Sequence, residues 1–357
     1  MAKTKSIYIC DACGAQHLKW QGQCPDCGKW NALSETRLNL RQGSQTTSRK
    51  PSVKPTRLDS LDIKRVERSN SGFSELDRVL GGGFVPGSVV LIGGDPGIGK
   101  STLLLSVVAN VSQNKNSCYV TGEESLDQIA LRAARLGVGE APVQLHSETC
   151  VENVIATLRV STPQVLVIDS IQTLFSEQLS SAPGSVAQLR ECAAQLVRFA
   201  KECNVATILV GHVTKEGILA GPRVLEHMVD TVLYFESDLG SRFRILRSAK
   251  NRFGAANELG FFVMGEDGFK EVKNPSAIFL SQRTDSVPGS VTLVTRESSR
   301  SLLVEVQALV DENLGTSPRR LAQGLDAQRL ALLLAVLHRH SGIGLSGHDV
   351  FTNVVGG

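Results

Sequence analysis

A short stretch of the chain has the glycines, lysine and serine of a phosphate-binding loop, in the spacing G-x-x-x-x-G-K-S. It is Gly94-Asp95-Pro96-Gly97-Ile98-Gly99-Lys100-Ser101, and Thr102 follows it. This pattern lets backbone N–H groups surround phosphates, while the lysine reaches the β- and γ-phosphates and the serine hydroxyl binds Mg²⁺. We therefore predict an ATP site at residues 94–102, in which Lys100 is catalytic and Ser101 binds Mg²⁺.

Acidic residues follow two other strand-like runs. Val165–Ile168 is apolar and ends at Asp169, whose carboxylate suits the Mg²⁺ shell. Glu123 and Glu124 follow the run Cys118–Thr121. Hydrolysis of ATP needs a base that orients water, and we expect Glu123 to be that base because it lies nearer the strand end. Glu124 better fits a helix start, where a carboxylate complements the helix dipole.

His212 follows a further apolar run, Val205–Val210. At the same sheet edge as the nucleotide, an imidazole could sense the γ-phosphate and pass the signal onward. An ordinary loop histidine is the alternative interpretation.

Two C-x-x-C-G repeats near the start supply four thiols, Cys10, Cys13, Cys24 and Cys27. Four thiolates in tetrahedral geometry suit Zn²⁺, and a site filled by four sulfurs is structural rather than catalytic. So small a unit has little core, so metal binding, worth about 10–16 kcal/mol in comparable peptides, must stabilise it.

Two tryptophans, Trp20 and Trp30, each follow a lysine beside the second repeat, Lys19 and Lys29. These rings could stack on bases or on a partner protein. We favour the simpler expectation that they cover the small metal core.

The bulk composition is that of an ordinary soluble protein, with 41% hydrophobic residues, 20% charged residues and a net charge of +3. Any basic surface must therefore be local. The first residues are polar and basic and no apolar run is long enough to span a membrane, so we expect a cytoplasmic protein. In that reducing compartment the remaining cysteines are expected to be core or helix residues, not disulfides: Cys118, Cys150, Cys192 and Cys203.

The residues of the nucleotide site need an α/β scaffold to bring them together. The chain divides into four segments, and the third has the pattern of such a scaffold. Residues 1–33 hold the paired cysteines, 34–69 are a basic linker, 70–270 alternate strands and helices as in a parallel sheet, and 271–357 form a smaller α/β piece. Expected strands are Ser88–Ile92, Cys118–Thr121, Val165–Ile168 and Val205–Val210, with the antiparallel pair Thr231–Phe235 and Phe243–Arg247. Expected helices are Lys100–Val111, Ser125–Leu136, which opens with a capping box, and Ser185–Glu202.

In the last segment, Phe351–Val355 reads as a strand and Ser317–His340 as an amphipathic helix. We expect the helix to turn its leucines toward the core: Leu321, Leu325, Leu330, Leu333 and Leu337. Because this segment stops at a strand, we interpret it as incomplete, with apolar surface left exposed.

The run Ser71-Gly72-Phe73-Ser74-Glu75-Leu76-Asp77-Arg78-Val79-Leu80-Gly81-Gly82-Gly83 resembles the RecA/KaiC superfamily. With the cysteine ribbon and the pentapeptide Lys250-Asn251-Arg252-Phe253-Gly254, the whole chain resembles the bacterial RadA/Sms family. The resemblance implies a RecA-like P-loop core with a mostly parallel sheet, an N-terminal C4 zinc ribbon and the start of a C-terminal Lon-protease-like α/β domain.

The resemblance also implies function: a DNA-dependent ATPase of recombinational repair that forms hexameric rings. Such a motor acts with the RecA recombinase on single-stranded or branched DNA and drives branch migration and unwinding, as a DnaB-type helicase does. Lys250 and Arg252 match an element that reaches the neighbouring subunit's nucleotide, with the physical logic of an arginine finger. A basic turn at a strand end is the alternative for these two residues, and a KaiC-like regulatory ATPase is the alternative function.

Two loops at the nucleotide edge are candidates for DNA contact, residues 172–184 and 214–223. In the second, Lys215 and Arg223 would bind phosphates, and an ordinary solvent-exposed loop is the alternative. The Ser-Lys dyad of Lon proteases would lie beyond Gly357, and we predict no peptidase activity.

Overall fold

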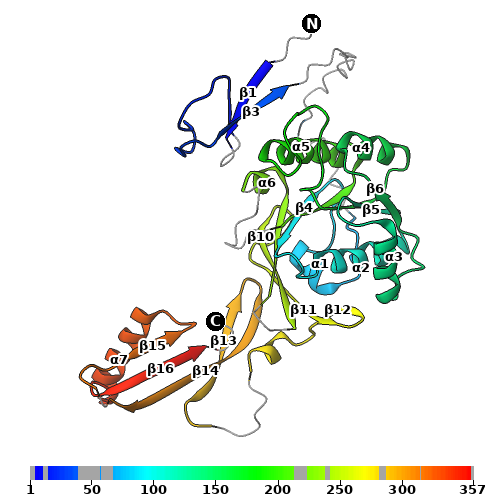
Figure 1. Cartoon of the computed structure of the whole chain (residues 1–357). Coiled ribbons are helices and arrows are strands. Elements are labelled where there is room, and N and C mark those ends of the chain that lie inside the picture. Colours follow the sequence, from blue (N-terminus) through cyan, green and yellow to red (C-terminus); the bar gives the residue numbers. More distant parts are fainter. Residues whose placement is uncertain are drawn as a thin grey trace. The chain divides into compact units, whose positions relative to one another are not determined.

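The computed structural model describes residues 5–10, 15–38, 57, 67–212, 223–237, 242–280, 287–313 and 315–354. The chain forms two compact units, Met1–Glu271 and Val272–Gly357, which are described separately. Figure 1 colours their helices and strands along the sequence. No helix of the described residues is long and apolar enough to cross a membrane.

The N-terminal ribbon is a small antiparallel sheet in the strand order β2-β1-β3. Its strands are β1 (Lys5–Cys10), β2 (Gln16–His17) and β3 (Leu33–Leu38). Strand β1 pairs with β3 along its whole length, from Lys5 opposite Leu38 to Cys10 opposite Leu33. The ribbon sheet therefore runs past residue 33, into the segment that the sequence assigns to the linker.

The first unit is built on a nine-stranded sheet in the order β12-β11-β10-β9-β4-β8-β7-β5-β6. Six neighbouring strands run parallel to one another: β9, β4, β8, β7, β5 and β6. Strands β10, β11 and β12 follow β9 on the other side, each antiparallel to its neighbour. The bounds are β4 (Val89–Gly94), β5 (Ser117–Thr121), β6 (Gln144–Ser147), β7 (Val165–Asp169), β8 (Ala206–Val210), β9 (Thr231–Glu236), β10 (Phe243–Asn251), β11 (Leu259–Gly265) and β12 (Gly268–Glu271). The mostly parallel sheet confirms the expected fold class, and the expected strands are confirmed to within two residues, except that β10 continues to Asn251.

Helices cover both faces of this sheet, which explains why its central strands are apolar throughout. Residues of α1 (Ser74–Leu80), α2 (Lys100–Ser112) and α3 (Leu126–Arg135) pack into one apolar cluster. Residues of α4 (Val151–Val160), α5 (Val186–Cys203) and α6 (Arg223–Met228) pack into another. Figure 1 shows the sheet between these two sets of helices.

Local capping fixes the start of α3 as the sequence predicts. Ser125 and Gln128 form the complete capping box, and Gly137 just beyond the helix has a φ of 69°. The scattered cysteines are also where they were expected: Cys118, Cys150 and Cys192 are buried and Cys203 is half-buried.

The second unit is a four-stranded sheet with one helix, in the strand order β13-β14-β16-β15. Its elements are the 3₁₀ turn η2 (Pro275–Ile278), β13 (Ser290–Glu297), β14 (Arg300–Glu312), β15 (Arg320–Gln323), α7 (Ala327–Ser341) and β16 (His348–Val354). Strand β16 confirms the expected strand near Phe351. Strand β15 pairs with it in parallel, and the other neighbours are antiparallel.

The expected helix over Ser317–His340 is half wrong. Its first part is strand β15, and α7 begins only after Asp326, whose side chain caps the helix by accepting from the N–H of Arg329 at 2.8 Å. Pairing with β16 overrides the helical periodicity there. Of the five leucines expected in the core, Leu330 is buried, Leu325 is half-buried, and the others are exposed: Leu321, Leu333 and Leu337.

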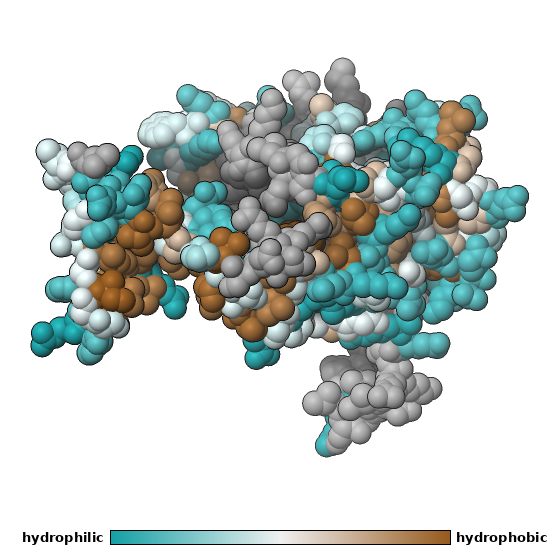
Figure 2. Space-filling model, turned by 90° about the horizontal axis from the view of Figure 1, so that it is seen from below, coloured by the Kyte–Doolittle hydropathy of each residue, from teal (hydrophilic) through white to brown (hydrophobic). Residues whose placement is uncertain are grey.

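Much apolar surface lies open on this second unit. Among its exposed side chains are Val291, Val294, Leu309, Leu332 and Val336. Figure 2 shows the brown, hydrophobic surface gathered at the left, over this unit. The exposed apolar side chains of the second unit agree with the apolar surface expected for this segment.

Candidate nucleotide site and zinc centre

The phosphate-binding loop lies between β4 and α2, in the strand–loop–helix context that the motif requires. Gly99 caps α2 with a φ of 110°, and a Cβ there would lie 2.6 Å from the ring of Phe269. A Cβ on Gly94 would lie 2.5 Å from the carbonyl oxygen of Phe235. Only glycine fits at these two positions, so the backbone can close around phosphates.

The side chain of Lys100 folds back into this loop. Its Nζ donates to the carbonyl oxygens of Gly94 at 2.7 Å and Asp95 at 2.9 Å. Burial lowers the pKa of Lys100, and the nearby carboxylates oppose that shift, Asp169 first. The ammonium group is thus held at the mouth of the loop, where a phosphate would be its next partner. The adjacent Ser101 is half-buried at the first turn of α2 and Thr102 is buried.

Asp169 ends strand β7, beside Thr121 at the end of β5. One carboxylate oxygen, Oδ2, accepts from the hydroxyl of Tyr119. The other, Oδ1, is buried and has no hydrogen-bond partner among the described residues. A buried, unpartnered carboxylate oxygen beside a phosphate loop fits an Mg²⁺ shell, because Mg²⁺ prefers oxygen ligands and keeps several waters.

Glu123 lies at the same edge of the sheet and is bonded to two residues from distant parts of the chain. Its Oε1 accepts from Nε2 of His212 at 3.0 Å and from Oγ of Ser170 at 2.5 Å. The hydrogen bond from His212 is the main cause that lowers the pKa of Glu123, while burial opposes it. Nδ1 of His212 lies 3.4 Å from Nζ of Lys100. The structure thus brings Lys100, Asp169, Glu123 and His212 together.

Glu124 turns to a different set of partners. Its carboxylate pairs with Arg132 of α3, and its backbone N–H and carbonyl both bond the hydroxyl of Thr121 at 3.0 Å. These contacts hold the start of α3, as the sequence suggests for this residue. Ser170 was not among the predicted site residues, although its place directly after Asp169 marks it as a residue of the same sheet edge.

The two basic residues of the pentapeptide 250–254 have partners within the chain. Nζ of Lys250 donates to the carbonyl oxygens of Glu226 and Val229, at 2.6 and 2.8 Å, at the end of α6. The guanidinium of Arg252 pairs with the buried Asp230 at 3.2 Å, yet its side chain is 58% exposed. In the single chain, Lys250 therefore holds helix α6, and Arg252 remains accessible to a neighbouring molecule.

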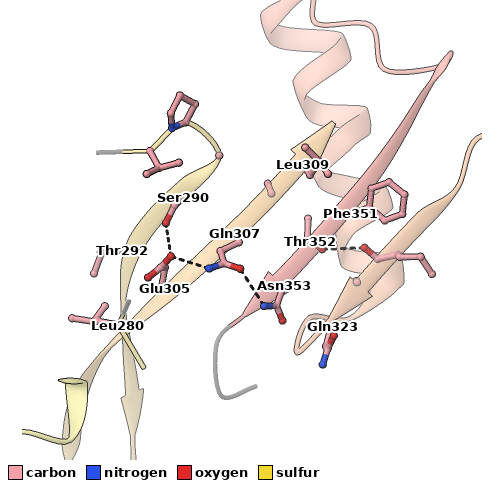
Figure 3. Close-up of a pocket in the computed structure, with 16 residues that line it drawn as sticks. Leu280, Ser290, Thr292, Glu305, Gln307, Leu309, Gln323, Phe351, Thr352 and Asn353 are labelled. Carbon is pink, nitrogen blue, oxygen red and sulfur yellow. Dashed lines mark hydrogen bonds between the residues drawn. The ribbon is translucent and has the colours of Figure 1, made fainter. Parts of the chain in front are cut away.

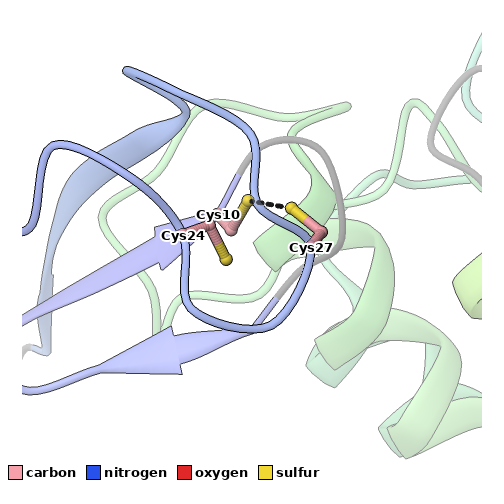
Figure 4. Close-up of side chains that lie close together, drawn as sticks. All are labelled: Cys10, Cys24 and Cys27. Carbon is pink, nitrogen blue, oxygen red and sulfur yellow. Dashed lines mark hydrogen bonds between the residues drawn. The ribbon is translucent and has the colours of Figure 1, made fainter.

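The three described cysteines of the ribbon form a thiol cluster (Figure 4). Sγ of Cys10 lies 3.6 Å from Sγ of Cys27, and these sulfurs and that of Cys24 are all within 4.8 Å of one another. A disulfide would bring two sulfurs to about 2.05 Å. Tetrahedral zinc, with Zn–S bonds near 2.3 Å, separates them by about 3.8 Å. The cluster therefore fits zinc, and Cys13, the fourth expected ligand, lies outside the described residues.

A histidine that was not among the predicted site residues, His17, lies against this cluster. Nε2 of His17 is 3.8 Å from Sγ of Cys24 and 3.3 Å from a carboxylate oxygen of Asp26. Groups that contact a metal-bound thiolate in this way orient the ligand. The position of His17 between the two C-x-x-C repeats is the sequence signal that indicates a place near the metal site.

Of the two loops expected to contact DNA, the second lies outside the described residues from 213 to 222, including Lys215. Arg223 is the first residue of α6, and its side chain is also outside the description. The first loop is described and is held by the buried Gln188 of α5. The amide of Gln188 accepts from the N–H of Ser176 at 2.8 Å and donates to three loop carbonyls, those of Ser176, Leu179 and Ser181.

A cavity of about 1080 Å³ lies within the second unit. A chain of side-chain hydrogen bonds crosses it from Ser290 through Glu305 and Gln307 to Asn353 (Figure 3). The residues that line it include no lysine or histidine in the part of the chain that the structure describes. The prediction that this chain has no peptidase activity stays a prediction.

Comparison with known proteins supports both sites. A family model described as an AAA domain matches residues 53–217, and one described as a rubredoxin metal binding domain matches residues 8–35. Among solved structures, an isolated ATPase domain aligns with a TM-score of 0.51 at 18% identity, covering 58% of this chain and 92% of that chain. A DnaB-like replicative helicase aligns with the same TM-score at 17% identity, covering 59% of this chain and 63% of that one. At such identities the two structures support the fold alone.

Three curated relatives match the whole chain and share one name, DNA repair protein RadA. The protein from Pseudomonas aeruginosa is 57% identical, that from Escherichia coli 50% and that from Bacillus subtilis 48%; each match covers 100% of this chain and 79% of the relative. With the phosphate loop, Asp169 and the thiol cluster in place, this identity shows a P-loop ATPase that uses ATP and Mg²⁺ and carries structural zinc. The chain belongs to the family of the DNA repair protein RadA.

Proposed function

We propose that this chain is a DNA-dependent motor of recombinational repair, which uses ATP hydrolysis to drive branch migration and unwinding of branched intermediates. The observation that carries the proposal is the position of Glu123. Its two side-chain partners, Ser170 and His212, each stand at the start of a loop that leaves the nucleotide edge of the sheet. DNA bound to either loop would therefore act directly on the candidate base.

We assign the catalytic roles as follows. Lys100 binds the β- and γ-phosphates, and the hydroxyl of Ser101 and the carboxylate of Asp169 hold Mg²⁺, which neutralises phosphate charge when bound. The ionised carboxylate of Glu123 accepts a hydrogen bond from the attacking water and orients it toward the γ-phosphate. His212, between Lys100 and Glu123, is placed to respond when a phosphate replaces its contact with the lysine.

The first loop supports the same coupling. Nε2 of Gln172 in this loop donates to the carbonyl oxygen of His212 at 3.4 Å, which connects it to the start of the second. Gln188 fixes the loop backbone through four hydrogen bonds. In the second loop, Lys215 and Arg223 would bind phosphates, which gives binding that is independent of sequence and weakened by salt.

We further propose a homo-oligomeric ring of hexameric type in which Arg252, with Lys250, reaches the nucleotide of the adjacent subunit. The exposure of the Arg252 guanidinium supports this role. Lys250 would have to leave the carbonyls at the end of α6, the helix that follows the second loop. Hydrolysis in one subunit would then affect α6 of the adjacent subunit, and with it the second loop, residues 214–223, of that subunit. The RecA recombinase as partner and a cytoplasmic location complete the proposal.

The division of the chain that goes with this proposal is a zinc ribbon at 1–33, a linker at 34–69, the ATPase core at 70–270 and a Lon-protease-like segment at 271–357. The separation of the two compact units after Glu271 supports the last of these limits. The pairing of β3 with β1 favours a ribbon that extends to Leu38.

The proposal is tested by the rate of ATP hydrolysis with and without single-stranded DNA at low salt, with Lys100→Ala as the blank. We expect strong stimulation by DNA that disappears in the variant and declines as salt is added. ATP-dependent displacement of a labelled strand from a branched DNA substrate is the second expected result. Intact basal hydrolysis without any stimulation would contradict the proposal and favour a regulatory ATPase of the KaiC type.

A further inference from the structure

The two tryptophans of the ribbon lie on its surface and do not cover the metal core. Trp20 is 56% exposed and Trp30 is 68% exposed, and the neighbouring Leu18 is 74% exposed. The small core of the ribbon is made instead by Cys10, Cys24 and Leu33 with partly buried neighbours. The expectation that these rings shield the zinc site is therefore wrong, and their exposure needs another explanation.

Both rings lie against one glycine and form a single surface. A Cβ built on Gly22 would be 3.7 Å from Cζ3 of Trp30 and 3.9 Å from Cη2 of Trp20. Backbone contacts hold Trp30 beside Gly22, because the N–H of Asn31 donates to the carbonyl of Gly22 at 2.8 Å and Gln23 forms a bridge with Trp30. The indoles are thus held side by side on the metal-stabilised turns. We call Trp20, Trp30 and Gly22 the tryptophan surface.

Positive charge accompanies the tryptophan surface. Lys19 and Lys29 each precede one of the tryptophans, and both are exposed. The sequence that follows the ribbon is strongly basic: residues 39–68 contain eight Lys or Arg and three Asp or Glu. Exposed aromatic rings beside lysines are how proteins bind unpaired nucleic acid, because bases stack on the rings while cations neutralise the phosphates.

We propose that the tryptophan surface binds single-stranded DNA, with bases stacked on the indoles of Trp20 and Trp30 and phosphates near Lys19 and Lys29. The ribbon is then a second DNA site, outside the ATPase core. The choice of DNA as the ligand rests on the proposed function. A protein partner would also bury two tryptophans, but it would not require the lysines or respond to unpaired bases.

The chain offers a direct probe, because its two tryptophans are the only ones in its sequence and both belong to this surface. Tryptophan emission of the full chain therefore reports on the ribbon. We expect oligo(dT) to quench this emission in a saturable, salt-sensitive way, since stacked bases quench indoles. A blunt duplex of the same length should quench far less, because its bases are already paired.

Variants separate stacking from folding. Trp20→Ala and Trp30→Ala should each weaken oligo(dT) binding about tenfold by fluorescence anisotropy of labelled DNA. Trp30→Phe should retain most of the affinity that Trp30→Ala loses. Leu18→Ala, which removes another exposed apolar side chain of the ribbon, should bind like the parent chain. Zinc content is measured for every variant, and the comparison uses those that retain zinc.

Two outcomes would overturn the proposal. One is unchanged tryptophan emission at saturating oligo(dT). The other is a double variant, Trp20→Phe/Trp30→Ala, that binds DNA with the same affinity as the parent chain. That result would favour a protein partner as the ligand of the tryptophan surface. Failure of the proposed function would look different: oligo(dT) would quench the tryptophan emission of the ribbon but would not stimulate ATP hydrolysis.

Discussion

Oε1 of Glu123 lies 3.0 Å from Nε2 of His212, although the two residues are 89 positions apart in the sequence. The first follows β5 and the second follows β8, and these strands end at the same edge of the sheet. The same histidine approaches Lys100 through its other ring nitrogen. Replacing His212 should therefore alter the ionisation of Glu123, with consequences for both catalysis and stability.

Replacing Glu123 by glutamine should lower the rate of ATP hydrolysis by about 100-fold or more while leaving ATP binding intact, because the amide cannot act as the base. The matched control is Glu124→Gln, which removes the pairing with Arg132 and should retain most activity. Steady-state hydrolysis and binding of a fluorescent ATP analogue measure the two properties. If the control variant loses hydrolysis and Glu123→Gln does not, the base is Glu124.

His212→Ala should move the acid limb of the hydrolysis profile to higher pH. The hydrogen bond from His212 is the main cause of the lowered pKa of Glu123, so in the parent chain this carboxylate stays ionised below its ordinary value of 4.5. Without that bond the pKa rises toward the ordinary value, and the base is protonated sooner as the pH falls. The pH dependence of kcat/KM tests this, and an acid limb that does not move would disprove the coupling.

The lowered pKa of Glu123 also has a consequence for stability. Its ionised form favours the folded chain above pH 4.5, and this contribution is lost as the pH falls through the lower folded-state pKa. With His212→Ala, the free energy of unfolding should therefore fall less steeply as the pH decreases below 4.5. Chemical denaturation of the two proteins at several acidic pH values measures the difference.

Gln188→Ala should reduce stimulation by DNA more than it reduces basal hydrolysis. The substitution leaves backbone groups of the first loop without their partner, at a cost of about 1–3 kcal/mol, and should loosen that loop. The exposed Gln164→Ala is the control. Equal loss of basal and stimulated rates would mean that Gln188 supports only the core.

Mixing two inactive variants should restore activity if Arg252 acts on a neighbouring subunit. Lys100→Ala removes the phosphate contact and Arg252→Ala the cationic group, so each variant is expected to be nearly inactive alone. In mixed assemblies some interfaces combine an intact phosphate loop with an intact arginine. Hydrolysis that rises well above either parent and peaks near equal proportions is the expected result. A mixture no more active than its components would argue for action within one chain.

Removal of zinc should unfold the ribbon and leave the nine-stranded sheet intact. Cys24→Ser, which alters a buried member of the thiol cluster, should lower zinc content and raise the accessibility of the tryptophans to a soluble quencher. The buried Cys192→Ser lies in α5, outside the cluster, and should keep its zinc. Zinc retained at one ion per chain in Cys24→Ser would rule out this residue as a ligand.

Local patterns in the sequence determined the phosphate loop, the capping of α3 and the strands of the core. Glycine spacing, capping residues and apolar runs act over a few positions, so they can be identified without knowledge of distant contacts. The same is true of the paired cysteines, whose spacing brings two thiols to one metal. The extent of the helix near residue 320 could not be determined in this way, because pairing with β16 decides it.

The tertiary structure decided which side chains meet. Folding brings Ser170 and His212 to one oxygen of Glu123, places Lys250 at the end of α6, and leaves Trp20 and Trp30 exposed. Local sequence places Ser170 and His212 at the sheet edge, but it does not indicate these contacts or the exposure of the tryptophans. Each of these depends on strand order and on what the neighbouring elements cover. Sequence determines which chemical groups the chain carries; the order of strands in the sheet determines which of them act together.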